Sequence, residues 1–331
     1  MKHISVIGCG TMGNGIAQTF ALFEFKVKLY DISLNNLDNA KKTILRNLER
    51  MLNKEVITHS ELEKTSENIT YTNDINSVVN SDLVIEAVSE NIEIKESIFK
   101  ELDAKCPEKT IIASNTSSIS ITKLANTTKR KDKVIGMHFM NPVPIMKLVE
   151  VINSTHTSKE TTNIILDLSK KLNKIPLTVN DYPGFISNRI LMPMINEAIE
   201  ALDQGVSNVK NIDGIMKLGM GHPMGPLQLA DLIGLDVCKS ILEVMLNGLK
   251  NEKYRPNKLL VDLVKKGKKV KLFAAKDIQK IDGVWTARTL QMITTKNKKL
   301  VHKSIFQLQD VKYNSNVDDA IFETEVMQRG L

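Results

Sequence analysis

Hydrophobic residues in the first 180 positions alternate between short runs rich in β-branched side chains and longer stretches with helical spacing. The short runs predict buried strands, and the longer stretches predict amphipathic helices that cover them. This alternation is typical of a mostly parallel sheet joined by crossover helices. The predicted strands are residues 3–8, 26–31, 69–72, 83–87, 110–113, 134–137, 147–152 and 176–179.

Four helices are predicted between these strands, at residues 12–23, 34–53, 92–105 and 158–172. The second helix is longer than a crossover needs, so we expect an inserted helical hairpin that runs to about Thr65. Residues 1–181 are therefore predicted to form one α/β domain.

The hydrophobic period becomes helical throughout after the breaker sequence Asp181-Tyr182-Pro183-Gly184. Ile190, Met194 and Ala198 follow the spacing of one buried helix face. An all-α domain is therefore expected over residues 182–267. Its further helices are predicted at residues 209–218, 227–232, 236–249 and 256–266.

The pattern changes again after Lys269, where Asp282-Gly283 and, more weakly, Lys296-Asn297-Lys298 signal tight turns. Alternating residues around these turns predict three strands, roughly 270–281, 284–294 and 300–312. A ribbon of three strands has little core of its own, so a tail at 268–331 is expected to be marginal unless it packs on the rest.

Composition indicates a folded chain with more than one core, since 331 residues are 42% hydrophobic and 25% charged. The net charge is +7, but residues 268–331 hold 12 basic and 7 acidic residues and so carry +5 of it. The charge is therefore read as diffuse surface lysine, and no nucleic-acid partner is expected.

Three widely spaced cysteines, without CxxC or HExxH, predict neither disulfides nor a metal site. They fit a reducing compartment. The apolar first 23 residues are interrupted at Asn14 and Gln18, so we expect no secretory signal, no membrane span and a cytoplasmic location.

A glycine-rich turn, Gly8-Cys9-Gly10-Thr11-Met12-Gly13, lies between the first predicted strand and helix. In such a turn Gly8 allows the bend, Gly10 admits a pyrophosphate, and Gly13 lets helix and strand pack closely. Thr11 and Met12 open the helix, whose unpaired N–H groups favour phosphate. This motif predicts a Rossmann-type sheet and a dinucleotide cofactor; the alternative is a glycine turn without a ligand.

Asp31 ends the second predicted strand, at the distance expected for a ribose ligand. Its carboxylate would accept a hydrogen bond from the adenosine 2′-hydroxyl and repel a 2′-phosphate, which favours NAD over NADP. Glu90, Lys95 and Asn115 follow later strands and are candidate contacts to the nicotinamide half. For Glu90 and Lys95 a solvated helix face is an equal alternative.

His138 and Glu150 lie on neighbouring predicted strands, in the segment HFMNPVPIMKLVE. Oxidation of a secondary alcohol needs a base for the hydroxyl proton, and we predict that His138 is this base. Glu150 is expected to bind the far imidazole nitrogen, fix the tautomer and stabilise the imidazolium. The alternative is an ordinary core histidine.

Two further polar residues border the predicted cleft. Ser117, in SNTSS, is placed to donate to the reacting oxygen, and Asn188, in PGFISNRIL, is placed to polarise the carbonyl or orient the imidazole. Each has an alternative role as a helix cap or a buried amide.

From Lys2 to about Lys266 the chain resembles the L-3-hydroxyacyl-CoA dehydrogenases, in particular the bacterial 3-hydroxybutyryl-CoA enzymes. The resemblance rests on IGCGTMG, SNTSSISIT, MHFMNPVPIMKLVEV, DYPGFISNRIL and MKLGMGHPMGPLQLADLIGLD. It implies that Ser117, His138, Glu150 and Asn188 are catalytic and that Asn141 approaches cofactor or substrate. It also implies a homodimer formed through the helical domain and a role in fatty acid or butanoate metabolism.

The acyl-CoA substrate is likewise implied by the resemblance. Lys54, at the end of the long predicted helix, matches a position that contacts CoA in relatives, and a solvated lysine is the equal alternative. We expect reversible oxidation of a short-chain 3-hydroxyacyl-CoA by NAD. A free hydroxy acid is the alternative substrate on the same framework.

The family pattern breaks near Lys268, because the stretch 265–272 lacks the later glycines and the aromatic residues of the form GRKxGxGFY that is usual there. Residues from about 270 to 331 contain DGVW (282–285), FQLQDVKYN (306–314) and MQRGL (327–331). With these segments they resemble the end of outer-membrane lipoprotein-sorting proteins, which predicts a fused fragment. The basic stretch 265–271 is read as a solvated linker, with CoA phosphate binding as its alternative. An inactive fusion protein whose β tail binds a partner is the remaining hypothesis.

Overall fold

The computed structural model describes residues 1–266, 269–281, 284–296 and 299–307. These residues belong to two compact units, Met1–Pro256 and Asn257–Leu331. The predicted boundary at 181/182 lies inside the first unit.

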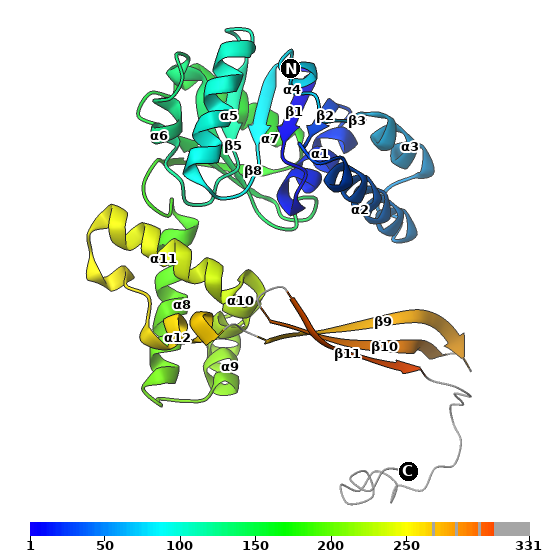
Figure 1. The fold of residues 1–331 in the computed structure, drawn as a ribbon, viewed down its shortest axis with the longest axis vertical. Coiled ribbons are helices and arrows are strands. Elements are labelled where there is room, and N and C mark those ends of the chain that lie inside the picture. The colour runs from blue at the N-terminus through cyan, green and yellow to red at the C-terminus, as the bar shows by residue number, and fades with distance from the viewer. Residues whose placement is uncertain (267–268, 282–283, 297–298, 308–331) are drawn as a thin grey trace, which may run out of the picture. The chain divides into compact units, whose positions relative to one another are not determined.

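The first unit contains an eight-stranded sheet with the strand order β3-β2-β1-β4-β5-β6-β7-β8 (Figure 1). Adjacent strands are parallel, except for the antiparallel pair β6 and β7. The strands are β1 (His3–Ile7), β2 (Lys26–Tyr30), β3 (Ile69–Thr72), β4 (Leu83–Glu86), β5 (Ile111–Ser114), β6 (Val134–Phe139), β7 (Leu148–Asn153) and β8 (Ile175–Asn180). Each lies within a few residues of its predicted range, and the Rossmann-type class is confirmed.

The strand order reverses at β1, which pairs with β2 on one side and β4 on the other. In open parallel sheets, such a switch point leaves a crevice at the carboxyl ends of the strands, and ligands bind there. The glycine-rich turn follows β1, so the sheet topology positions it at this crevice.

Helices cover both faces of the sheet. They are α1 (Thr11–Leu22), α2 (Leu34–Asn53), α3 (His59–Glu67), α4 (Ile75–Val78), α5 (Ile92–Lys105), α6 (Ile121–Ala125) and α7 (Lys159–Lys171), with a 3₁₀ turn at Lys131–Lys133. Residues of α1, α2 and α7 share one buried cluster, and residues of α5 and α6 share another. Figure 1 shows α1 and α2 on one side of the sheet and α5 and α6 on the other. The short helices α4 and α6 were not predicted.

The predicted helical hairpin is present as α2 and α3. Ser33 caps α2 by accepting a hydrogen bond from the Asn36 N–H. Thr58 and Glu61 form a reciprocal capping box at the start of α3, which satisfies two N–H groups that the helix leaves unpaired. Local sequence therefore determines where both helices begin.

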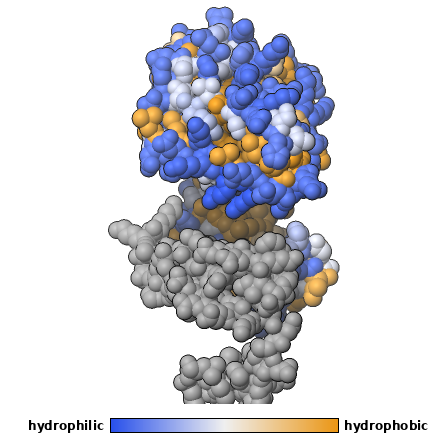
Figure 2. All heavy atoms as spheres, turned by 90° about the vertical axis from the view of Figure 1, so that its right-hand side faces the viewer, coloured by the Kyte–Doolittle hydropathy of each residue, from blue (hydrophilic) through white to orange (hydrophobic). Residues whose placement is uncertain are grey.

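The rest of the first unit is helical, as predicted. It comprises α8 (Ser187–Asp203), α9 (Val209–Gly219), α10 (Pro226–Ile233), α11 (Leu235–Leu249) and a 3₁₀ turn at Glu252–Tyr254. In the part of the chain that is described, no helix is both long enough and apolar enough to cross a membrane. The coloured residues of the face in Figure 2 are mostly hydrophilic, with hydrophobic residues interspersed.

The second unit contains α12 (Lys258–Lys266) and the antiparallel strands β9 (Lys269–Ile281), β10 (Val284–Lys296) and β11 (Lys299–Gln307). The strand β10 pairs with both of the others. The predicted three-stranded ribbon is therefore present. The predicted turn at 282–283, the centre of the one near 297 and the end of the third predicted strand fall outside the described residues.

Candidate active site

Two glycines of the β1–α1 turn lie where a side chain cannot fit. Gly8 has φ +94°, and a Cβ there would lie 2.8 Å from the Ala87 carbonyl oxygen. A Cβ on Gly13 would lie 1.8 Å from the Gly8 carbonyl oxygen. By contrast, a Cβ on Gly10 would meet no atom within 4 Å. The first and third glycines are thus required by packing, whereas the second borders open space.

The start of α1 is suited to an anion. Gly10 precedes the helix without any side-chain cap, and the first turn contains no acidic residue. The N–H groups of Thr11 and Met12 therefore lie at the positive end of the helix dipole without a competing carboxylate. A hollow of about 280 Å³ opens here, lined by this turn and by α2 residues such as Asn36 and Asn39. These residues fit the pyrophosphate of a dinucleotide.

Asp31 follows β2 beside the turn. Its Oδ2 accepts hydrogen bonds from Cys9 N at 3.1 Å and Cys9 Sγ at 3.2 Å, and its Oδ1 accepts from Ser33 N at 3.0 Å. Burial alone would raise the pKa of Asp31, but these hydrogen bonds outweigh it and lower the pKa. Asp31 is thus an ionised acceptor, as the predicted ribose contact requires.

Glu90 accepts hydrogen bonds from the loop Ser114–Ser118. Its Oε1 accepts hydrogen bonds from Thr116 Oγ1 at 2.6 Å, from Ser118 Oγ at 2.9 Å and from the Ser117 N–H at 3.1 Å. Burial opposes ionisation of Glu90, but the charge of Lys95 and these donors lower its pKa. Glu90 therefore positions Ser117, a role that the sequence did not indicate.

Lys95 is only 1% exposed, so it does not lie on a solvated helix face. Its Nζ lies 2.6 Å from Glu86 Oε1 and 3.5 Å from Glu90 Oε2. Ser114 Oγ donates to the other oxygen of Glu86 at 2.6 Å. A direct contact between Lys95 and the cofactor stays a prediction; the observed contacts connect it to the loop through Glu90.

His138 and Glu150 lie opposite each other, because β6 and β7 pair in a register that matches these two residues. His138 Nδ1 lies 2.8 Å from Glu150 Oε2. The two residues are 8% and 3% exposed, so water competes little for this hydrogen bond. When Nδ1–H donates to the carboxylate, Nε2 is the nitrogen that can accept a proton.

Glu150 remains a carboxylate despite its burial. Burial by itself would raise its pKa, but hydrogen bonds from His138 and Ser187 and the attraction of the imidazole lower it. A negative charge behind the ring stabilises an imidazolium. The pair can therefore take up a proton at Nε2.

Asn188, in α8, connects the helices that follow the sheet to the loop that carries Ser117. Its Nδ2 donates to the Ser117 carbonyl oxygen at 2.8 Å, and the residue is 7% exposed. Asn115 Oδ1 accepts from the Phe139 N–H at 2.9 Å, directly after His138. Asn141 is exposed in the loop after β6. The structure thus pairs His138 with Glu150 and Ser117 with Asn188, while the catalytic roles of these four residues stay predictions.

Comparison with known proteins identifies the family. A family model described as the NAD-binding domain of 3-hydroxyacyl-CoA dehydrogenase matches residues 3–182. The chain belongs to the 3-hydroxyacyl-CoA dehydrogenase family. The model of the C-terminal domain of these enzymes matches residues 184–274. A third model, described only as an uncharacterized protein, matches residues 250–329.

Named relatives cover most of this dehydrogenase. A probable 3-hydroxybutyryl-CoA dehydrogenase from Bacillus subtilis is 49% identical over 267 residues, covering 81% of this chain and 93% of that protein. Mitochondrial hydroxyacyl-coenzyme A dehydrogenase from Homo sapiens is 45% identical over 249 residues, covering 73% and 79%. The crystal structure of (S)-3-hydroxybutyryl-CoA dehydrogenase from Ralstonia eutropha has a TM-score of 0.78 and 44% identity, covering 80% of this chain and 94% of that chain.

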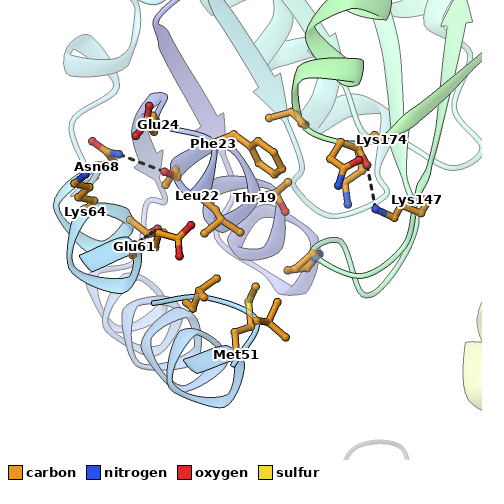
Figure 3. Close-up of a pocket in the computed structure, with 17 residues that line it drawn as sticks. Thr19, Leu22, Phe23, Glu24, Met51, Glu61, Lys64, Asn68, Lys147 and Lys174 are labelled. Atoms are coloured by element: carbon orange, nitrogen blue, oxygen red, sulfur yellow. Dashed lines mark hydrogen bonds between the residues drawn. The ribbon is translucent and has the colours of Figure 1, made fainter. Parts of the chain in front are cut away.

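A separate pocket of about 580 Å³ lies between α1, the α2–α3 hairpin and the segments before β7 and β8 of the dehydrogenase (Figure 3). Lys147 and Lys174 line one side of it. Lys174 Nζ donates to the carbonyl oxygens of Val143 at 2.5 Å and Met146 at 2.8 Å. None of the predicted site residues lines this pocket, so it is distinct from the candidate active site.

Lys54 is the remaining predicted residue. It is exposed and caps the C-terminus of α2 in the hairpin, where its N–H donates to Arg50 O. Contact with CoA stays a prediction for this residue.

Several residues of the dehydrogenase that form hydrogen bonds with the predicted site residues were not predicted from the sequence. They are Glu86, Thr116, Ser118 and Ser187. Runs of serine and threonine after a strand, and a serine before Asn188, were the available signals, but hydroxyl partners depend on tertiary neighbours.

Proposed function

We propose that this dehydrogenase catalyses the reversible, NAD-dependent oxidation of a short-chain L-3-hydroxyacyl-CoA, such as 3-hydroxybutyryl-CoA, to the 3-ketoacyl-CoA. The observation that carries the proposal is the buried His138–Glu150 pair, with 2.8 Å between Nδ1 and Oε2. It supplies the base that alcohol oxidation needs. The names of the relatives that span most of the chain support the substrate class.

In this proposal His138 Nε2 removes the proton of the 3-hydroxyl group. Glu150 keeps the proton on Nδ1 before the reaction and stabilises the imidazolium afterwards. Asn188, in α8, and Ser117, in the loop after β5, orient the substrate oxygen. In the reverse direction, the imidazolium returns the proton to the carbonyl oxygen.

Bound NAD would supply the hydride acceptor for this oxidation. The turn at Gly8, Gly10 and Gly13 and the start of α1 would hold its pyrophosphate, and Asp31 would hold the adenosine ribose. Glu90, Lys95, Asn115 and Asn141 are assigned to the nicotinamide side.

Acyl-CoA specificity is assigned to the cleft and to Lys54, whose positive charge would meet a CoA phosphate. The exposed position of Lys54 on the hairpin is compatible with this contact. A free 3-hydroxy acid lacks that phosphate, so comparing the two substrates tests the assignment directly.

The oligomeric state proposed for the chain is a homodimer formed through the helical part. Large apolar side chains are exposed there, including Leu218, which is 91% exposed, Leu232 and Val206. Burial of such residues in a symmetric interface would be favourable. A mass in solution of twice 37.1 kDa is expected, and Leu218→Glu should reduce it.

We also propose a cytoplasmic location and domain boundaries at 181/182 and 267/268. All three cysteines are free and buried, which suits a reducing compartment. The tail is proposed to be a fused fragment that resembles lipoprotein-sorting proteins.

The deciding experiment follows NADH oxidation by the purified chain with acetoacetyl-CoA and, separately, with acetoacetate. We expect activity with the thioester and little with the free acid. His138→Gln should lower kcat by about 10²–10⁴-fold while NADH binding is retained. Equal rates for the two substrates would contradict acyl-CoA specificity, and an active His138→Gln variant would contradict the base assignment.

A further inference from the structure

Ser187 lies at the start of α8, beside the buried carboxylate of Glu150. Three donors of this helix start reach that carboxylate. The N–H groups of Ile186 and Ser187 donate to Oε1 at 3.3 and 3.0 Å, and Ser187 Oγ donates to Oε2 at 2.7 Å. These three hydrogen bonds to the Glu150 side chain connect the start of α8 to the strand β7.

The hydroxyl of Ser187 shares its acceptor with the histidine. Glu150 Oε2 is also the atom that lies 2.8 Å from His138 Nδ1. The two backbone donors hold Oε1, and any non-proline residue at 186 or 187 would provide them. The hydroxyl that holds Oε2 is provided by the serine side chain alone.

A local capping role does not account for this hydroxyl. The residue that precedes α8 is Ile186, and no side chain caps the helix. The hydrogen bond of Ser187 Oγ is directed to Glu150, 37 positions away in the sequence. The hydroxyl therefore connects the helical part to the candidate active site.

We propose that Ser187 is a positioning residue that fixes the Glu150 carboxylate behind His138 and thereby fixes the tautomer of the imidazole. This inference rests on the proposed function, because the tautomer matters when Nε2 must accept a proton. In this role Ser187 acts through Glu150 and does not itself touch substrate or cofactor.

The hydroxyl also affects the charge of Glu150. Burial raises the pKa of Glu150, and hydrogen bonds from His138 and Ser187 lower it. Loss of the Ser187 hydroxyl removes one of these donors, so the carboxylate should be protonated at higher pH. The acidic limb of the pH profile of kcat/KM should then move upward.

The test compares Ser187→Thr with Ser187→Val in the full chain. The two side chains have nearly the same shape, and threonine alone keeps a hydroxyl. We expect the threonine variant to stay within about threefold of the parent, whereas the valine variant loses kcat on the order of tenfold, with KM changed less than twofold. Its acidic limb should move upward by roughly half a pH unit.

A second readout does not depend on activity. The ¹⁵N signals of the His138 ring, assigned through their loss in His138→Gln, report which ring nitrogen carries the proton. The parent and the threonine variant should show protonated Nδ1, and the valine variant should show a mixture of tautomers. Ser187→Ala gives the same comparison if the valine variant does not fold.

The outcomes separate the two proposals. Identical kinetics, pH limb and ring signals in the threonine and valine variants would overturn the role of Ser187. A change of ring signals in a chain without dehydrogenase activity would support the positioning role while refuting the proposed function. Parallel losses in both variants, with unchanged ring signals, would also overturn the inference, because they indicate a packing defect.

Discussion

Lys95 and Glu86 form an ion pair that is closed to solvent, with 2.6 Å between Nζ and Oε1 and side chains that are 1% and 0% exposed. The pair lies beneath the loop that carries Ser117, because Glu86 also accepts a hydrogen bond from Ser114 Oγ. Removal of the Lys95 charge leaves the Glu86 carboxylate buried without its opposite charge. The stability of the nucleotide-binding sheet should therefore depend on both residues together.

Lys95→Met is expected to lower the free energy of unfolding by about 3–5 kcal/mol, measured by urea denaturation at pH 7. The double variant Lys95→Met with Glu86→Gln serves as its control and should recover a large part of the loss. If the single variant is as stable as the double variant, the unpaired charge of Glu86 is not the cause of the loss.

Two glycines of the β1–α1 turn should respond differently to the same substitution. Gly13→Ala places a Cβ 1.8 Å from the Gly8 carbonyl oxygen, so we expect a loss of more than about 4 kcal/mol or a failure to fold. Gly10→Ala meets no atom within 4 Å and should keep the parent melting temperature. Its affinity for NADH should nevertheless fall about tenfold, because the backbone there must approach the pyrophosphate.

Thermal unfolding and NADH fluorescence titration measure both effects. A Gly10→Ala variant that binds NADH as tightly as the parent would show that the pyrophosphate is bound elsewhere.

Asp31→Asn should change the choice of cofactor. The substitution keeps the approximate shape but removes the charge that repels a 2′-phosphate, so the KM for NAD should rise about tenfold and the preference for NAD over NADP should shrink. Asp38→Asn, on the exposed surface of α2, removes the same charge nearby and serves as the control. An equal response of the two variants would point to a general effect of net charge.

Lys174 should make stability depend on pH in the alkaline range. Burial, followed by the charge of Lys147, lowers its pKa from 10.5 to about 8. Between these values the unfolded chain binds more protons than the folded chain, so the free energy of unfolding should rise with pH. At pH 7 both states are protonated, and the penalty for burying the charge is fully present.

The measurement is the difference in unfolding free energy between the parent and Lys174→Met. From pH 7 to pH 10 this difference should shift in favour of the parent by on the order of 2 kcal/mol. A difference that stays constant over this range would show that Lys174 titrates normally. Lys171→Met, on the exposed surface of α7, provides a matched control.

The sequence by itself determined the elements and the nucleotide-binding turn. Hydrophobic period, glycine spacing and capping residues act over a few positions, so the bounds of α2 and α5 and the glycine turn could be predicted directly. The proximity of His138 and Glu150 could be predicted as well, since a short return between two strands places them on adjacent strands.

Only the tertiary structure decided which polar groups share a partner. Ser187 and Glu150 lie 37 positions apart, and Ser117 and Asn188 lie 71 apart, so no local pattern encodes these contacts. The burial of Lys95 could not be predicted either, because a lysine in a buried ion pair and a lysine on a solvated helix face look the same in the sequence. The physical reason is that local propensity fixes backbone conformation, whereas hydrogen-bond partners and desolvation are set when distant elements pack.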